Sequence, residues 1–84
     1  RSRKDGDLEV WVRELEDGSK AVGLFNRGRG MAEIGALWSD IGVEGPQEVR
    51  DLWRQQDLGI YEGVFKAYVA SHGVVMVRMR PAVR

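Results

Sequence analysis

The chain has 84 residues, 43% of them hydrophobic and 31% charged, and its 13 basic and 13 acidic side chains give a net charge of zero. A chain of this length forms one domain with one core and little room for a deep pocket, and its balanced charge argues against nucleic acid as a partner. It has no cysteine, which excludes disulfides and thiolate metal sites, and no apolar run approaches the roughly 20 residues of a membrane helix.

The first predicted element is a β-hairpin. Residues 8–16 alternate between apolar and polar side chains, which is typical of a half-buried strand. One face of this strand has Leu8, Val10 and Val12, and the other has Trp11 and Arg13. The pair at residues 17–18, Asp-Gly, favours a tight hairpin turn. Residues 20–26 then form the return strand, and because both its faces are mostly apolar, we expect it to lie centrally in a sheet.

The middle of the chain predicts further short strands. After a turn, residues 31–38 form a third strand, and a loop follows. Residues 47–54 would also suit a short helix, but the flanking Pro46 and Gly59 favour a strand. Residues 55–59 are then expected to form a turn.

The last third of the chain predicts two more strands. Residues 63–69 place Phe65, Ala67 and Val69 on one face, and a turn at residues 71–73 precedes the strand at 74–80. Pro81 should end that strand, because proline cannot donate a hydrogen bond to a neighbouring strand. Six to eight short strands with turns about every 8–12 residues indicate an antiparallel sandwich or barrel.

Five stretches of the sequence carry a resemblance to a known family. They are residues 7–13 (DLEVWVR), 21–28 (AVGLFNRG), 38–42 (WSDIG), 51–59 (DLWRQQDLG) and 72–78 (HGVVMVR). In this order and spacing they resemble the C-terminal domain of glycoside hydrolase family 27, the α-galactosidases. The resemblance covers most of residues 5–80 and implies an all-β fold, a small antiparallel β-sandwich of the Greek-key type, as one domain over residues 1–84.

The resemblance also implies a division of labour. In this family an N-terminal (β/α)8 barrel carries two catalytic aspartates, in a retaining mechanism that needs carboxylates about 5 Å apart. Neither aspartate maps onto this chain. We therefore expect a fragment of a larger glycosidase: a non-catalytic accessory domain, without cofactor or activity of its own, that packs on and stabilises the barrel of the same polypeptide. The resemblance leaves open whether the parent acts on galactose, N-acetylgalactosamine or arabinopyranose, and it leaves the compartment and oligomeric state open.

The acidic residues could be taken for a catalytic pair. They gather as Asp5, Asp7 and Glu9; Glu14, Glu16 and Asp17; and Glu44, Glu48 and Asp51. A catalytic acid needs a raised pKa in an apolar pocket. These residues alternate with apolar ones or lie in turns, so we expect them to face water.

Two further features have a structural interpretation. His72 is the only histidine, and without a second histidine or a cysteine it does not indicate a metal site. Its place between Ser71 and Gly73 is typical of a turn. The stretch at residues 28–30, Gly-Arg-Gly, joins two strands, whereas a dinucleotide-binding loop joins a strand to a helix.

The three tryptophans are the remaining candidates for function. Trp38 and Trp53 lie among apolar residues and are expected in the core, whereas Trp11 should face water, the second sheet or the missing barrel. Arg13, Asn26 and Arg27 lie on or beside the same hairpin as Trp11. We predict that these four residues contact the barrel. The alternative is a carbohydrate-binding module whose exposed aromatic side chains bind galactosides weakly; neither alternative involves nucleic acid or a membrane.

Overall fold

The computed structural model describes residues 2–82, with side chains from residue 6 onward. Its strands are β1 (Ser2–Asp5), β2 (Leu8–Glu14), β3 (Lys20–Asn26), β4 (Ala32–Leu37), β5 (Gln47–Asp51), β6 (Gln56–Tyr61), β7 (Val64–Val69) and β8 (Val74–Pro81). One short helix, α1 (Trp38–Ile41), follows β4. All strand pairs are antiparallel, and the chain is an all-β sandwich, as predicted.

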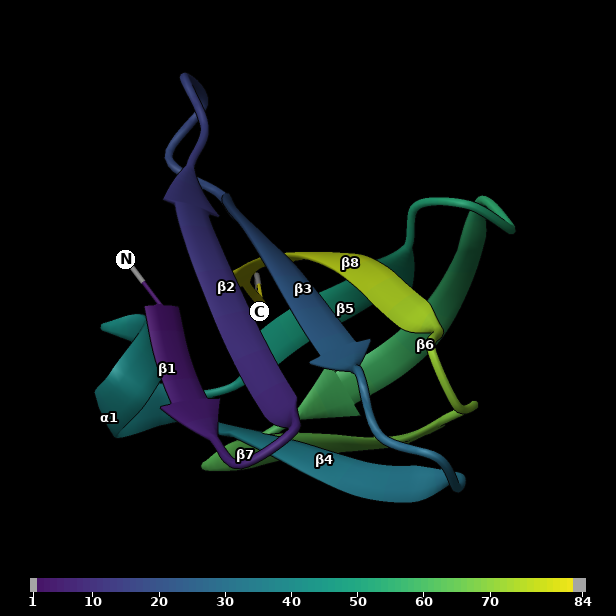
Figure 1. Cartoon of the computed structure of the whole chain (residues 1–84). Helices are drawn as coiled ribbons and strands as arrows, with labels where there is room; N and C mark the ends of the chain where they lie inside the picture. Colours follow the sequence, from purple (N-terminus) through teal and green to yellow (C-terminus); the bar gives the residue numbers. More distant parts are fainter. Residues whose placement is uncertain (1, 83–84) are drawn as a thin grey trace.

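The strands form two sheets of unequal size. The large sheet has the order β1-β2-β3-β8-β5-β6, and the small sheet pairs β4 with β7. In Figure 1, β2 and β3 lie in front of β5 and β6, and β4 and β7 cross below them. Strand β8 follows β7 of the small sheet after a short turn and lies between β3 and β5 in the large sheet.

The core lies between the two sheets. Alternate residues of β3 and β8, among them Val22, Leu24 and Val77, are fully buried there. The small sheet contributes Ile34 and Phe65 from the other side. The prediction that residues 20–26 form a central strand is confirmed, because β3 pairs with β2 along one edge and with β8 along the other.

Helix α1 begins where the sequence predicted the end of a strand. Trp38 is buried, its backbone N–H bonds the carbonyl of Gly63, and its indole N–H bonds the carbonyl of Gly45 at 2.8 Å. The helix ends at Gly42, whose positive φ of 84° is a conformation that glycine adopts without strain. The predicted burial of Trp38 is confirmed, but Trp38 belongs to helix α1 and not to the preceding strand.

Strand β6 occupies residues that were predicted as a turn. The turn lies earlier, at residues 52–55, where a carboxylate oxygen of Asp51 accepts the backbone N–H groups of Trp53 and Arg54. Gly59 does not end the segment; it lies within β6, where a register shift against β5 marks a bulge. Among the described residues no helix is long and apolar enough to cross a membrane.

Candidate interaction face of the large sheet

The outer face of the large sheet, which points away from the core, gathers aromatic and apolar side chains. Strand alternation places Trp11 of β2, Phe25 of β3, and Val74 and Met76 of β8 there. These four residues are called the aromatic face below. Trp11 is 52% exposed, whereas the three others are half-buried against one another. The indole of Trp11 lies 6.2 Å from the Phe25 ring, centre to centre, with the planes tilted by 60°.

A glycine forms the floor of the aromatic face. Gly23 pairs with Trp11 on one side and with Met76 on the other, yet it is buried. A Cβ atom at this position would lie 2.8 Å from the Met76 sulfur and 2.8 Å from a ring carbon of Phe25. These two side chains therefore cover the glycine, and the absence of a side chain lets them close over the sheet.

An ion pair and a hydrogen bond fix the orientation of Trp11. Its indole N–H donates to one carboxylate oxygen of Glu9 at 2.8 Å, and the other oxygen pairs with the Arg27 guanidinium at 3.0 Å. The Glu9 side chain is only 13% exposed. The prediction that this acid faces water is therefore wrong: two donors satisfy the carboxylate in the partly buried site beside Trp11.

The predicted hairpin residues have different surroundings. Arg13 and Arg27 are exposed on the side of the aromatic face. Asn26 instead points inward and is 1% exposed. Its amide donates to the carbonyls of Gly30 at 2.7 Å and Val69 at 2.9 Å, and its oxygen accepts the N–H of Gly28. Asn26 therefore joins the β3–β4 turn to the small sheet, and an external contact stays a prediction for Trp11, Arg13 and Arg27.

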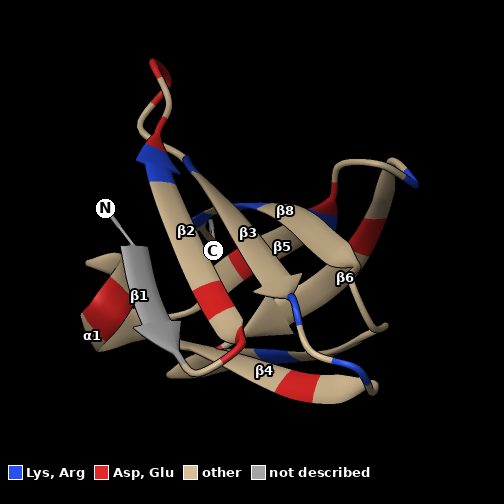
Figure 2. Cartoon of the chain, in the orientation of Figure 1, with Lys and Arg blue, Asp and Glu red and all other residues tan. Residues whose placement is uncertain are grey.

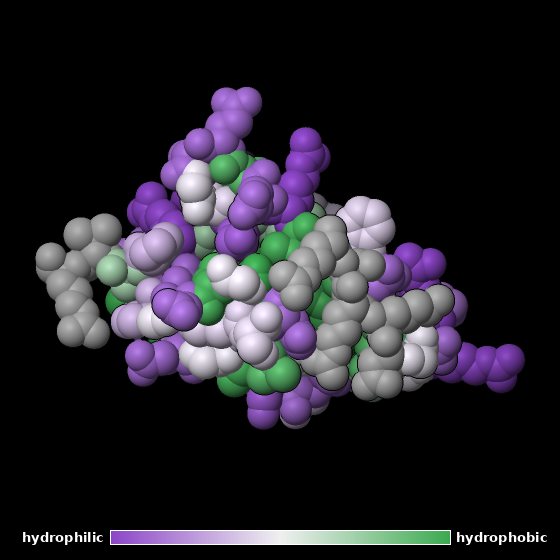
Figure 3. Space-filling model, turned by 90° about the vertical axis from the view of Figure 1, so that its left-hand side faces the viewer, coloured by the Kyte–Doolittle hydropathy of each residue, from purple (hydrophilic) through white to green (hydrophobic). Residues whose placement is uncertain are grey.

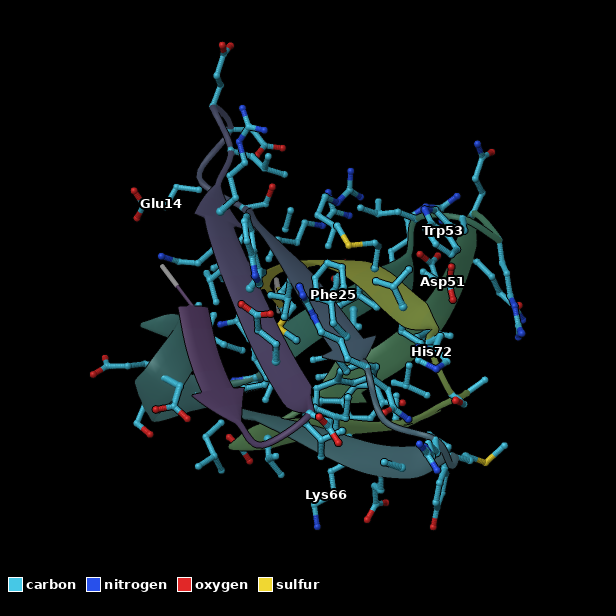
Figure 4. The ribbon with its side chains drawn as sticks, viewed as in Figure 1. Glu14, Phe25, Asp51, Trp53, Lys66 and His72 are labelled. Carbon is cyan, nitrogen blue, oxygen red and sulfur yellow. The ribbon has the colours of Figure 1, made fainter. Side chains whose placement is uncertain are left out.

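The prediction that Trp53 lies in the core is wrong. It is 67% exposed in the β5–β6 turn. The preceding residue, Leu52, donates its N–H to the carbonyl of Met76, which attaches this turn to the strand that carries part of the aromatic face. Figure 4 shows Trp53 at the upper right and Phe25 near the centre of the view, whereas Lys66 points downward from the small sheet.

The arrangement of acids offers no catalytic pair among the described residues. Asp7, Glu14, Glu16, Asp17 and Glu44 are exposed, as expected for solvated groups. Glu48 pairs with Arg80, and Asp51 caps its turn. The side chain of Asp5 lies outside the described ones. No group of three or more histidine, aspartate or glutamate side chains comes together in the described part of the chain.

The hollows of the surface are also poor in catalytic groups. One of about 560 Å³ lies at the end of the sandwich near α1 and is lined by Lys20, Trp38, Glu44 and Gln47. Glu44 is the only acid among the described residues that line it. A second, of about 340 Å³, adjoins the aromatic face between Phe25, Arg27 and His72 and has no acid in its lining. His72 is exposed in a turn with a positive φ of 56°, as its sequence position predicted.

One acid has a shifted pKa. The hydroxyl and backbone N–H of Ser19 donate to the carboxylate of Asp17 in the β2–β3 turn. These hydrogen bonds favour the ionised form and lower the pKa of Asp17 from its ordinary value of 3.8. A lowered pKa does not suit a general acid at neutral pH, so this shift belongs to the turn and not to catalysis.

Comparison with known proteins identifies the fold. Residues 5–79 match the family described as the α-galactosidase C-terminal β-sandwich domain. The chain is 37% identical over 81 residues to an α-galactosidase of Cyamopsis tetragonoloba, a match that spans 94% of this chain but 20% of the plant protein. The chain therefore covers about a fifth of the length of this relative.

Solved structures give the same result. The α-galactosidase I of Mortierella vinacea contains a region that superposes on 95% of this chain with a TM-score of 0.90 and 30% identity, and this region is 22% of that chain. A family 27 β-L-arabinopyranosidase of Geobacillus stearothermophilus gives a TM-score of 0.92 at 27% identity over 96% of this chain and 19% of its own.

Proposed function

The chain belongs to the family of α-galactosidase C-terminal β-sandwich domains, and from this we propose that it is the non-catalytic accessory domain of an α-galactosidase-like retaining glycoside hydrolase. In that protein it packs on and stabilises a catalytic (β/α)8 barrel. The observation that carries the proposal is the match of nearly the whole chain to about a fifth of a much longer glycosidase.

The chemistry of the described residues supports a role without catalysis. A retaining glycosidase needs two carboxyl groups about 5 Å apart, one of them with a raised pKa. Most of the described acids are exposed, cap turns or pair with arginines such as Arg27 and Arg80. The reacting groups of the parent enzyme therefore lie in the remaining part of the polypeptide.

The same fold occurs beside different activities. The two structural relatives are named an α-galactosidase and a β-L-arabinopyranosidase, although their sandwiches superpose almost equally well on this chain. This similarity supports a domain that does not select the sugar. We propose an α-galactoside as the substrate of the parent enzyme, because curated relatives that are 37% and 40% identical to this chain are α-galactosidases.

Sugar binding by the aromatic face has less support. Protein sites for sugars combine an aromatic ring with free hydrogen-bonding groups that fix the ligand's orientation. Here the Trp11 indole N–H and both oxygens of Glu9 already have partners. A titration of this chain with galactose, followed by tryptophan fluorescence, should therefore show no saturable change.

The proposal is tested on the complete polypeptide that contains this domain. It should hydrolyse a chromogenic α-galactoside, whereas the 84-residue chain should not. Deleting the domain should shorten the half-life of the enzyme on heating, because the barrel loses the surface that covers it. Activity of the 84-residue chain alone, or a deletion that leaves the half-life unchanged, would contradict the proposal.

A further inference from the structure

We infer that the aromatic face, Trp11, Phe25, Val74 and Met76, is the surface through which this domain packs on the catalytic part of its parent glycosidase. The inference rests on the proposed function and specifies its contact. It commits to one occupant: a surface of the same polypeptide with an apolar centre and carboxylates at its rim.

The side chains of the aromatic face are already ordered in a way that favours contact with a protein. Trp11 is half exposed, but its indole is fixed by Glu9 and packs against Phe25. A side chain that is already ordered loses little entropy when it is covered. Tryptophan and arginine are also the residues that most often dominate binding energy at interfaces, and Trp11 and Arg27 lie here together with one carboxylate between them.

The charges of this face indicate the chemistry of the partner. Among the described side chains, the outer side of the large sheet carries five arginines, Arg13, Arg27, Arg50, Arg78 and Arg80, and three carboxylates, Glu9, Glu48 and Asp57. The excess is positive although the whole chain is neutral. Figure 2 shows the basic colour at the end of β2 and along β8. Carboxylates on the partner would pair with these arginines, which suit bidentate contacts.

The paired strands of the small sheet do not form a comparable outer face. On the outer side of the small sheet, Tyr68 is 69% exposed and Leu37 is 43% exposed. The pair of Gly35 and Lys66 lies between them in the register, so a charged side chain separates the two apolar ones. In the side view of Figure 3, hydrophilic side chains lie along the upper and right-hand edges, and apolar ones lie nearer the centre.

The size of the face and the length of the relatives agree with an interdomain contact. From β2 to β5 the sheet is roughly 14 Å wide and a seven-residue strand is about 23 Å long. The product of these lengths, counted on both partners, reaches the lower end of the area of interfaces between domains of one chain, about 600–1,500 Å² in total. About four-fifths of the Cyamopsis relative lies outside the match. In a parent protein of similar length, that remaining part would provide the partner surface.

Site-specific photocrosslinking in the complete polypeptide tests the inference. A benzophenone amino acid replaces Trp11 in one variant and Tyr68 in the other, a matched control because both are exposed aromatic residues on opposite outer sides. After irradiation, mass spectrometry identifies the attached peptides. We expect attachment from position 11 to peptides outside these 84 residues, and none from position 68.

The other outcomes separate the inference from the proposed function. Attachment from position 68, alone or with position 11, would overturn the choice of face and leave the accessory role intact. Attachment of position 11 to a second copy of the domain would overturn the occupant. No attachment from either position would contradict both the face and the packing role.

A charge reversal provides an independent measurement. Arg13→Glu places a negative charge on the side of the large sheet that carries the aromatic face, and Lys66→Glu places one on the outer side of the small sheet. Both Arg13 and Lys66 are exposed. In the complete enzyme, R13E should shorten the half-life on heating several-fold, whereas K66E should leave it nearly unchanged. Equal effects of the two variants would overturn the assigned charge complementarity.

Discussion

The two faces of the large sheet use the same strands for different purposes. On the inner face, Val22 and Leu24 of β3 are 0% exposed and lie in a closed core. On the outer face of the same strand, Phe25 covers Gly23 but leaves the neighbouring Trp11 half exposed. Apolar side chains that gather on an outer surface can mark an interaction site, and here they gather around the half-exposed Trp11.

This difference separates residues that stabilise the domain from those that serve a contact. Inner-face substitutions should cost the same free energy of unfolding in the isolated domain and in the parent enzyme. Outer-face substitutions should cost little in the isolated domain and more in the parent, because only the parent covers them. The predictions below test this separation, beginning with the largest effect.

The largest effect is expected for Leu24→Ala. Leu24 is fully buried in the core, and truncation of such a side chain leaves a cavity that costs about 2–5 kcal/mol. The matched outer-face variant, Trp11→Ala, should cost about 1 kcal/mol, because it loses an aromatic contact and only partial burial. Urea unfolding of the 84-residue chain measures both. Equal losses of stability would contradict the distinction between the faces.

A smaller loss is expected for Asn26→Ala. The variant removes three hydrogen bonds and leaves partners such as the Val69 carbonyl without this donor. An unsatisfied buried polar group costs about 1–3 kcal/mol. Arg27→Ala, one residue further, is the control and should cost less than about 1 kcal/mol, because its side chain is 61% exposed and Glu9 keeps its hydrogen bond from Trp11. If the control were the more destabilising variant, Asn26 would not be the residue that joins the sheets.

Gly23→Ala tests the floor of the aromatic face. The new methyl group would meet Met76 and Phe25 at 2.8 Å, so both side chains must move. Overpacking of this kind costs about 1–3 kcal/mol, and because Met76 is flexible we expect the lower end of that range. Met76→Ala in the same chain should recover part of the loss in urea unfolding. Additive losses would indicate that Met76 does not cover the glycine.

The sequence predicted the first hairpin better than the segment after β5. The alternation of residues 8–16 and the mostly apolar residues 20–26 were sufficient to predict two paired strands, which the structure places at Leu8–Glu14 and Lys20–Asn26. Strand β6 was missed because only Leu58 and Tyr61 pack inward and its other residues are mostly exposed. Its signal was therefore that of a turn, and pairing with β5 determines its conformation instead.

The candidate face was only partly visible in the sequence. Its alternation with Val10 and Val12 placed Trp11 on the face opposite to theirs but left open whether it meets water, the second sheet or a barrel. The structure places it on the outer side of the sheet, 52% exposed. The partners Glu9 and Arg27 are 18 residues apart and meet only through the pairing of β2 with β3. Trp53 was misplaced because the capping of its turn by Asp51 depends on local geometry that periodicity does not report.

The smallest effect concerns acid stability at the tip of the hairpin, away from both faces. Folding lowers the pKa of Asp17 below 3.8 through the hydrogen bonds from Ser19. A lowered folded pKa contributes stability above about pH 3.8, and this contribution is lost as the pH falls through the folded value. The Asp17→Asn variant should therefore unfold at lower urea than the wild type near neutral pH, with the difference shrinking below pH 3.8.

Glu16→Gln, at the exposed neighbouring residue, should follow the wild type at every pH. A difference for D17N that stays constant down to about pH 2 would show that the Ser19 hydrogen bonds do not favour the ionised carboxylate.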